Sequence, residues 1–205
     1  MLAELDAQST VLPGAEPMPG ETLPRVRAGV TALPTTSRDG SANLYDLFTR
    51  SAARHATRPC LGRRVAAADG SPGPFEFIDY AEALRSVRVI GSGLRLLGAS
   101  ANSTLGLWLS NRIEWMLTAL GAFSQSVVVV PMYDTLGDDA MVYELNHAEV
   151  SIVVLERAKL AKLGALLATC PAVRSVVQIE RTASRFTHAA YVSALRRVDR
   201  RVVVH

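Results

Sequence analysis

Short, continuously apolar runs that alternate with helical patterns are the feature that most constrains how this chain can fold. The runs are Thr104–Leu109, Val127–Pro131, Ser151–Leu155 and Ser175–Ile179. A half-exposed strand would alternate apolar and polar residues, whereas these runs do not, which is typical of strands buried on both faces of a parallel sheet. The segments between them carry apolar residues at helical spacing. The order from residue 79 therefore predicts an α/β protein with an open, mostly parallel sheet and flanking helices.

Capping signals mark the predicted helix starts. A side chain that can accept a hydrogen bond is followed three residues later by an acid at four places, and these begin at Asn43, Asp79, Asn111 and Thr135. Each such pair can satisfy free N–H groups at a helix start and complement its positive end. Gly98 follows an apolar helical stripe and predicts a helix end, because glycine tolerates the backbone conformation that closes a helix.

Three regions follow from these patterns. Residues 1–42 contain five prolines and no sustained period, so we expect an irregular, partly ordered extension. Residues 43–180 form the α/β domain, which begins with a small β-hairpin: Gly62–Arg64 and Phe75–Phe77 flank the turn residues Asp69–Gly73. Residues 181–205 hold six arginines and one aspartate and form a basic tail.

Composition excludes several classes of protein. The chain has 205 residues and a net charge of +3. Its apolar fraction of 49% excludes a wholly disordered chain. With only two cysteines, the chain cannot be a disulfide scaffold. It contains no stretch of about 18 apolar residues, so no membrane-spanning helix is predicted. The acids Glu4 and Asp6 argue against a secretory signal. We therefore expect a cytoplasmic protein, or one peripheral on an intracellular membrane, without a C-terminal peroxisomal signal.

The basic tail has two interpretations. Clustered arginines can bind nucleic acid or anionic lipid, but a solvated chain end is the simpler reading. We expect no nucleic-acid partner.

The sheet order predicts where a ligand would bind. In open parallel sheets, ligands occupy the edge beyond the carboxyl ends of the strands. Three loops begin at this edge: Ser110–Asn111, Met132–Thr135 and the loop after Leu155. Tyr133 and Asp134 are the best local candidates, although Asp134 could equally cap the next helix or brace its turn.

Other motifs fail as reactive sites. Gly91 and Gly93 lie inside a predicted helix, so they favour close helix packing over a phosphate loop. Cys60 and Cys170 have no local histidine partner and are expected to be buried apolar residues. The histidines at 55, 147, 188 and 205 lack the spacing of metal ligands. No catalytic, cofactor-binding or metal-binding residue is assigned.

Several segments together resemble the N-terminal portion of eukaryotic long-chain acyl-CoA synthetases, members of the adenylate-forming superfamily. The resemblance covers roughly residues 23–180, so we expect the basic tail at 181–205 to be non-family sequence. Its most specific parts are Val130–Gly137, which is VPMYDTLG, and Tyr143–Val150, which is YELNHAEV. Weaker matches are found at Asn43–Phe48, Cys60–Arg64, Phe77–Ala83, Ile90–Leu94 and Leu107–Trp115.

The resemblance implies a fatty acid–CoA ligase. Such enzymes use ATP and Mg²⁺ to form an acyl-adenylate and then transfer the acyl group to coenzyme A. The family's phosphate loop and later motifs have no counterpart in residues 1–205, so we expect a fragment that is inactive alone and binds none of these cofactors. An alternative is a non-catalytic interaction protein derived from this family, with a protein partner at an exposed apolar face.

Overall fold

The computed structural model describes residues 8–31, 36–37, 39–66 and 69–179, together with the backbone of two short strands at 196–198 and 202–204. The chain divides into two compact units, Met1–Asn43 and Leu44–His205. In the first unit, β1 (Ser9–Val11) pairs antiparallel with β2 (Arg25–Arg27). The Arg25 guanidinium donates to the Ser9 hydroxyl at 3.0 Å and to its carbonyl at 2.8 Å. The sequence analysis expected no strand here.

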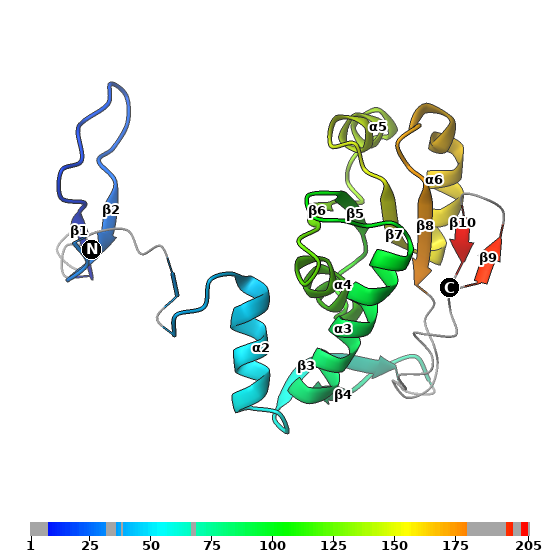
Figure 1. Cartoon of the computed structure of the whole chain (residues 1–205), viewed down its shortest axis with the longest axis horizontal. Coiled ribbons are helices and arrows are strands. Elements are labelled where there is room, and N and C mark those ends of the chain that lie inside the picture. Colours follow the sequence, from blue (N-terminus) through cyan, green and yellow to red (C-terminus); the bar gives the residue numbers. More distant parts are fainter. Residues whose placement is uncertain are drawn as a thin grey trace. The chain divides into compact units, whose positions relative to one another are not determined.

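A parallel sheet forms the centre of the second unit (Figure 1). Its four principal strands are β5 (Thr104–Trp108), β6 (Val128–Pro131), β7 (Ile152–Glu156) and β8 (Ser175–Ile179). They lie in the order β6-β5-β7-β8 and all pair in parallel. The chain runs from β5 to β6 on one side and then returns to place β7 on the other side of β5. The predicted open parallel α/β sheet is confirmed.

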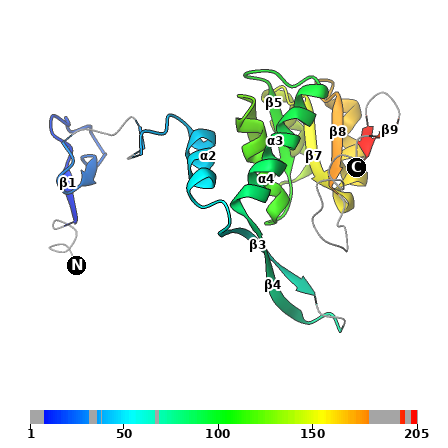
Figure 2. The same cartoon turned by 60° about the horizontal axis from the view of Figure 1, so that its bottom comes forward.

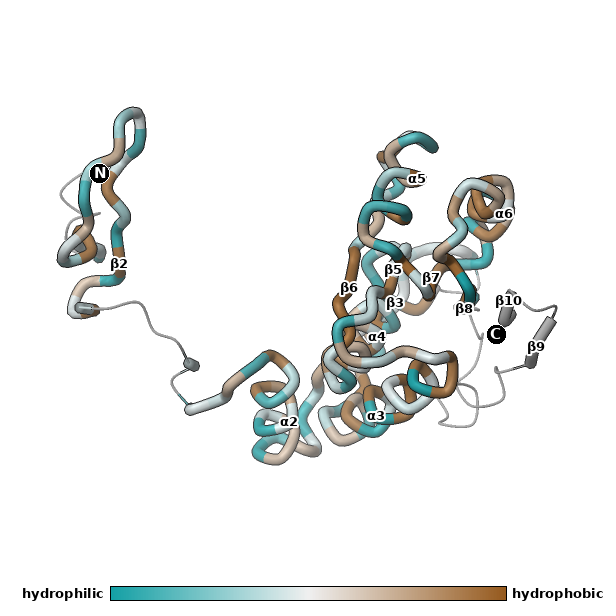
Figure 3. Tube along the Cα trace, turned by 45° about the horizontal axis from the view of Figure 1, so that its top comes forward, coloured by the Kyte–Doolittle hydropathy of each residue, from teal (hydrophilic) through white to brown (hydrophobic). Residues whose placement is uncertain are grey.

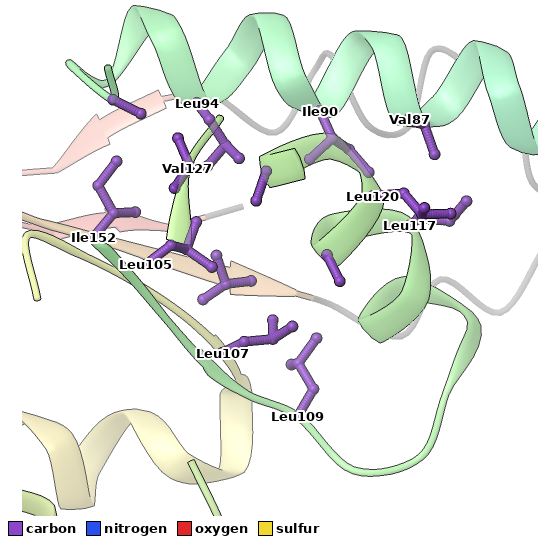
Figure 4. Packing of buried hydrophobic residues seen from close by; sticks show 14 of the residues in the cluster. Val87, Ile90, Leu94, Leu105, Leu107, Leu109, Leu117, Leu120, Val127 and Ile152 are labelled. Carbon is purple, nitrogen blue, oxygen red and sulfur yellow. The ribbon is translucent and has the colours of Figure 1, made fainter. Parts of the chain in front are cut away.

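Two hydrophobic cores cover the two faces of this sheet. On one face, Leu105, Leu107 and Ile152 pack against helices α3 (Tyr80–Leu96) and α4 (Ile113–Phe123), as Figure 4 shows. On the other face, Val153 and Leu155 pack with residues of α5 (Asp138–His147) and α6 (Leu160–Leu166). Successive residues of a strand face opposite ways, so adjacent positions of β7 join different cores. This burial on both faces explains the continuous apolar run of β7.

The two other predicted strands are less buried than their sequences suggest. Val128 of β6 is exposed, because β6 borders only β5 within the described sheet. Figure 3 shows β6 as a continuously hydrophobic segment. In β8 the burial alternates, with Val176 and Gln178 buried between half-buried neighbours. Full burial on both faces was therefore wrong for β6 and β8, since burial depends on neighbours in space.

Helix α3 begins and ends as its sequence predicts. The Asp79 carboxylate caps its first turn by accepting from the Glu82 N–H at 2.7 Å. At the other end, Gly98 adopts a positive φ of 92°, and its N–H donates to the Arg95 carbonyl. Two glycines bring α3 close to α4: a Cβ added at Gly91 would meet the Ser124 hydroxyl and lie 3.0 Å from the Gly121 carbonyl oxygen. The packing interpretation of Gly91 is consistent with this contact.

Two other predicted caps are wrong. Helix α4 has Arg112, not Asn111, at its N-cap, and helix α5 has Gly137, not Thr135. Neither helix start has a side-chain cap hydrogen bond. Both helices begin instead beside charged groups from other loops, which a local sequence pattern does not reveal.

The remaining elements are α2, the hairpin and short helical turns. Helix α2 (Leu44–Arg54) contacts α3, and β3 (Pro59–Ala66) pairs antiparallel with β4 (Pro72–Asp79), as the hairpin prediction expected. The 3₁₀ turns η1 (Arg157–Lys159) and η2 (Leu167–Thr169) flank α6. Within the part of the chain that the structure describes, no helix is both long and apolar enough to cross a membrane.

Of the basic tail expected at 181–205, only β9 (Arg196–Val198) and β10 (Val202–Val204) belong to the described residues. The β10 backbone pairs parallel with β8 and antiparallel with β9. The rest of that prediction lies outside the described residues.

Candidate functional site

The three loops predicted to border a ligand site meet at the carboxyl ends of β5, β6 and β7. The strand order reverses between β5 and β7, which makes this edge the topological switch point where ligands bind in open α/β sheets. The side chains of Ser110, Asp134 and Glu156 come from these three loops and belong to one connected polar network. The sequence therefore indicated the correct edge of the sheet for this network.

Glu156, the last residue of β7, joins its strand to the loop after β5. Its Oε1 accepts from the Ser110 N–H at 2.9 Å and from the Ser110 hydroxyl. Arg112 Nη1 lies 3.6 Å from the same oxygen, and Lys159 Nζ lies 3.9 Å from Oε2. One carboxylate thus ties together the two strands that border the switch point.

Arg112 also forms a poorly exposed ion pair with Glu114. Its guanidinium donates from Nε to Glu114 Oε2 at 2.8 Å and from Nη2 to Oε1 at 3.0 Å. The two side chains are only 19% and 11% exposed. A two-pronged pair in a poorly solvated position is both directional and strong. Glu114 therefore serves as the partner of Arg112 in the first turn of α4.

Asp134 braces its turn and does not cap α5. Its Oδ1 accepts from the indole Nε1 of Trp108 at 2.7 Å and lies 2.8 Å from Lys159 Nζ. Lys159 Nζ also lies 5.5 Å from the centre of the buried Trp108 ring. The bracing alternative considered for Asp134 describes these contacts. Its neighbour Tyr133 is exposed and has no part in the described network.

A second lysine holds the start of α5. Lys162 Nζ lies 3.1 Å from Asp138 Oδ1 and 3.5 Å from the Leu136 carbonyl oxygen. It also lies 5.8 Å from the Trp108 ring centre. Lys159 and Lys162 both come from the segment after β7, so one short stretch anchors the whole turn between β6 and α5. This explains how α5 begins without a side-chain cap.

The network keeps its acids ionised. Burial alone would raise the pKa of Glu114, but hydrogen bonds and the charge of Arg112 outweigh it and lower that pKa. Burial would also raise the pKa of Glu156, but hydrogen bonds from Ser110 and the charges of Lys159 and Arg112 outweigh this effect and lower the pKa. The pKa of Asp134 is lowered mainly by Lys159. All three carboxylates are therefore charged at neutral pH.

Each acid of this network contacts a cation or an N–H donor, and these contacts join the strand ends to one another. No adenylation step is assigned to the network. Among the residues that the structure describes, no group of three or more His, Cys, Asp or Glu side chains is arranged to hold a metal ion.

The other candidates from the sequence lie elsewhere. Cys170 is buried in the core formed with α5 and α6. The pKa of the Cys60 thiol is raised, mainly by burial and to a smaller extent by the negative charge of Asp79. A raised pKa disfavours the reactive thiolate. His55 lies near Tyr80, and His147 stacks on Tyr143 with ring centres 5.2 Å apart. His188 and His205 fall outside the described residues.

Sequence reasoning did not single out Trp108, Arg112, Glu156, Lys159 or Lys162 as members of the network. One signal was available. Lys159 and Lys162 are the only lysines among 22 basic residues, and both lie in the segment that follows the predicted strand Ser151–Leu155.

Solved structures of CoA ligases and of an adenylation domain share the α/β fold of this chain. The adenylation domain of a carboxylate reductase from Mycobacterium chelonae superposes with a TM-score of 0.60 at 17% identity, covering 74% of this chain and 25% of that one. An anthranilate CoA ligase in complex with anthranoyl-AMP gives a TM-score of 0.59 at 17% identity, covering 72% and 26%.

Residues 48–202 match the family model of the AMP-binding enzymes, and the chain belongs to this family. Its curated relatives include fatty acyl-CoA synthetase A of Dictyostelium discoideum, 36% identical over 157 residues, which cover 76% of this chain and 23% of the relative. Long chain acyl-CoA synthetase 4 of Arabidopsis thaliana is 34% identical over 133 residues, covering 65% and 19%. The resemblance to long-chain acyl-CoA synthetases is thus confirmed. The chain spans about a fifth of the length of these relatives.

Proposed function

We propose that these residues are the leading α/β part of a long-chain fatty acid–CoA ligase and that their contribution is structural. The match of residues 48–202 to the AMP-binding enzymes is the observation that carries this proposal. ATP, Mg²⁺, coenzyme A and a long-chain fatty acid would be the cofactors and substrates of the whole enzyme. The charge network at the switch point would hold the edge of the first sheet rigid for the parts that carry the chemistry.

The proposal has two consequences. The 205-residue chain alone should give no palmitate-dependent exchange between ATP and pyrophosphate, because the family's phosphate loop and later motifs have no counterpart in residues 1–205. A chimera should be active, however, if residues 48–179 replace the matching segment of the Dictyostelium fatty acyl-CoA synthetase A. The same chimera carrying Arg112→Met is the matched control and should lose most of its palmitoyl-CoA synthesis. Exchange by the chain alone would contradict the proposal, and so would a folded but inactive chimera.

The second candidate is a non-catalytic protein that acts through an exposed apolar surface. The observation that favours it is the outward position of Phe75 and Phe77 in the hairpin β3–β4, which are 54% and 58% exposed. Large apolar side chains gathered on one exposed surface commonly mark an interaction site. This candidate predicts that the isolated chain binds a partner through the hairpin, whether or not ligase chemistry occurs elsewhere.

A further inference from the structure

The β-hairpin sorts its side chains onto two different faces. Cross-strand partners share a face, and the register pairs Gly62 with Phe77 and Arg64 with Phe75. These four residues form one face, here called the aromatic face. The other face carries the pairs Leu61–Ile78 and Arg63–Glu76. The hairpin projects from the helices and the sheet of its unit (Figure 2).

The face opposite the aromatic face is turned toward the body of the unit. Leu61 and Ile78 pack against the core formed with α3 and α4. The charge of Arg63 contributes to the lowered pKa of Glu114 in α4. The hairpin thus packs its aliphatic pair against the domain and turns its two aromatic rings outward. An ordinary amphipathic sheet carries polar side chains on its outward face.

The aromatic face is held in a defined arrangement. The rings of Phe75 and Phe77 have centres 6.0 Å apart, and the Arg64 guanidinium lies 4.7 Å from the centre of the Phe75 ring. Phe77 lies flat against Gly62, where an added Cβ would be 2.5 Å from its Cε1. Glycine at this position therefore lets the ring lie against the backbone. The two rings therefore form an apolar surface, and the Arg64 guanidinium lies over the Phe75 ring.

The three acids in the described part of the hairpin lie outside the aromatic face. Glu76 lies on the opposite face beside Arg63, at 3.8 Å. Asp79 caps α3, and the Asp69 carboxylate accepts from the Ser71 N–H at 2.9 Å within the turn. Of the residues that the structure describes on the aromatic face, Arg64 alone is charged. The face is therefore apolar and cationic.

We propose that the aromatic face of the hairpin is a docking surface for an anionic lipid bilayer. Phenyl rings can enter the boundary between headgroups and acyl chains, and the long arm of Arg64 can lie along them while its charge meets lipid phosphates. The face is a convex projection and not a groove, so a deformable surface matches it better than a rigid protein ridge. The proposal is independent of ligase activity, since binding requires neither ATP nor coenzyme A.

The test is co-flotation of the 205-residue chain with phosphatidylcholine vesicles, with and without phosphatidylserine. Binding should be stronger to the phosphatidylserine vesicles. The double variant Phe75→Ser/Phe77→Ser should weaken it about tenfold, because two apolar groups no longer enter the bilayer. Arg64→Gln should weaken binding to the anionic vesicles about fivefold.

Controls separate this surface from others. Arg63→Gln removes the neighbouring charge from the opposite face and should leave binding near the wild-type value. Tyr143→Ser removes an aromatic ring that is 65% exposed on α5 and should also have little effect. The arginines of residues 181–205 are present in every variant, so their contribution is constant. Thermal unfolding checks that the hairpin variants remain folded.

Three outcomes would overturn the proposal. The wild-type chain could fail to bind either type of vesicle. The double serine variant could bind as well as the wild type, which would assign the binding to another surface such as the arginine-rich tail. Finally, the wild-type chain could form dimers that the double variant loses, without vesicle binding, which would make the aromatic face an interface between two copies.

Discussion

Lys159 Nζ lies 2.8 Å from Asp134 Oδ1, and this contact joins the turn after β6 to the segment after β7 across 25 residues of sequence. The lysine is the more buried partner: its side chain is 10% exposed, against 59% for Asp134. It also approaches Glu156 and the Trp108 ring. Lys159 therefore links three strand ends, whereas Asp134 contributes one exposed side of the link.

Replacing Lys159 tests this link. We expect Lys159→Met to lower the free energy of unfolding by about 1 kcal/mol, because it removes a cation from Asp134 and Glu156. The loss stays small because water can solvate the exposed Asp134 carboxylate once the lysine is gone. Urea denaturation followed by circular dichroism measures the change. Lys162→Met is the matched control and should cost less, since both Lys162 and its partner Asp138 are substantially exposed. Equal losses for the two variants would show that Lys159 is not the central cation.

Breaking the Arg112–Glu114 pair should have a larger effect. We expect Arg112→Met to lower the free energy of unfolding by about 2 to 3 kcal/mol at neutral pH, because Glu114 and Glu156 lose a common cation in a poorly solvated position. Denaturant unfolding gives the measurement. Arg50→Met is a suitable control, because Arg50 pairs with Asp46 at an exposed position on α2. A loss no greater than that of the control would contradict the importance of burial.

The pH dependence of stability follows from the same acids. Folding lowers the pKa of Glu114 and Glu156 from a usual value of 4.5. Such groups stabilise the folded state above their unfolded pKa, and this contribution disappears as the pH falls through the folded pKa. The free energy of unfolding should thus decline below about pH 4.5. The difference between wild type and Arg112→Met should narrow over the same range, since protonation removes the unpaired charge. A constant difference across that range would refute this explanation.

Two glycines of α3 should respond in opposite ways to the same substitution. Gly91→Ala should lower the free energy of unfolding by about 1 to 3 kcal/mol, because the new methyl group meets Ser124 and the Gly121 carbonyl. Gly93→Ala should raise it by up to about 1 kcal/mol, since nothing lies within 4 Å of that position and alanine favours the helix. Melting temperatures of the two variants provide the comparison. The α3–α4 packing would be in doubt if Gly91→Ala were as well tolerated as Gly93→Ala.

The Asp79 cap supplies a smaller test. Asp79→Ala should cost about 1 kcal/mol, because the Glu82 N–H loses its acceptor at the start of α3. Asp79→Asn should retain most of the stability, since an amide oxygen can accept the same bond. Chemical denaturation distinguishes the two. If both substitutions cost the same, the contribution would come from the charge of Asp79 and not from its hydrogen bond.

Local signals in the sequence were sufficient for much of the fold. The apolar runs predicted β5 through β8 to within one residue or so at each end, and the run Ser175–Ile179 coincides with β8. The Asp79 cap and the Gly98 helix end were also correct. These features depend on interactions between residues close in the chain, so a local pattern contains the necessary information.

The sequence pointed to the edge of the sheet where the polar network lies, but it did not identify most of the residues that form this network. Asp134 was singled out, whereas Lys159 and Glu156, which define its setting, were not. Their pairing depends on β7 lying beside β5, because this neighbourhood brings residues 25 to 46 positions apart into contact. The failed caps at Asn111 and Thr135 have the same origin, since charged groups from distant loops hold the starts of α4 and α5.

The sequence by itself determined the alternation of helices and strands, the parallel α/β class and the family, because apolar period, caps and the VPMYDTLG block are properties of consecutive residues. Tertiary structure alone decided that β6 is exposed beside β5, that polar and charged side chains and the Trp108 indole form a network at the switch point, and that Phe75 and Phe77 face outward. Each of these depends on which segments become neighbours in space, and burial and electrostatic pairing are set only after that choice is made.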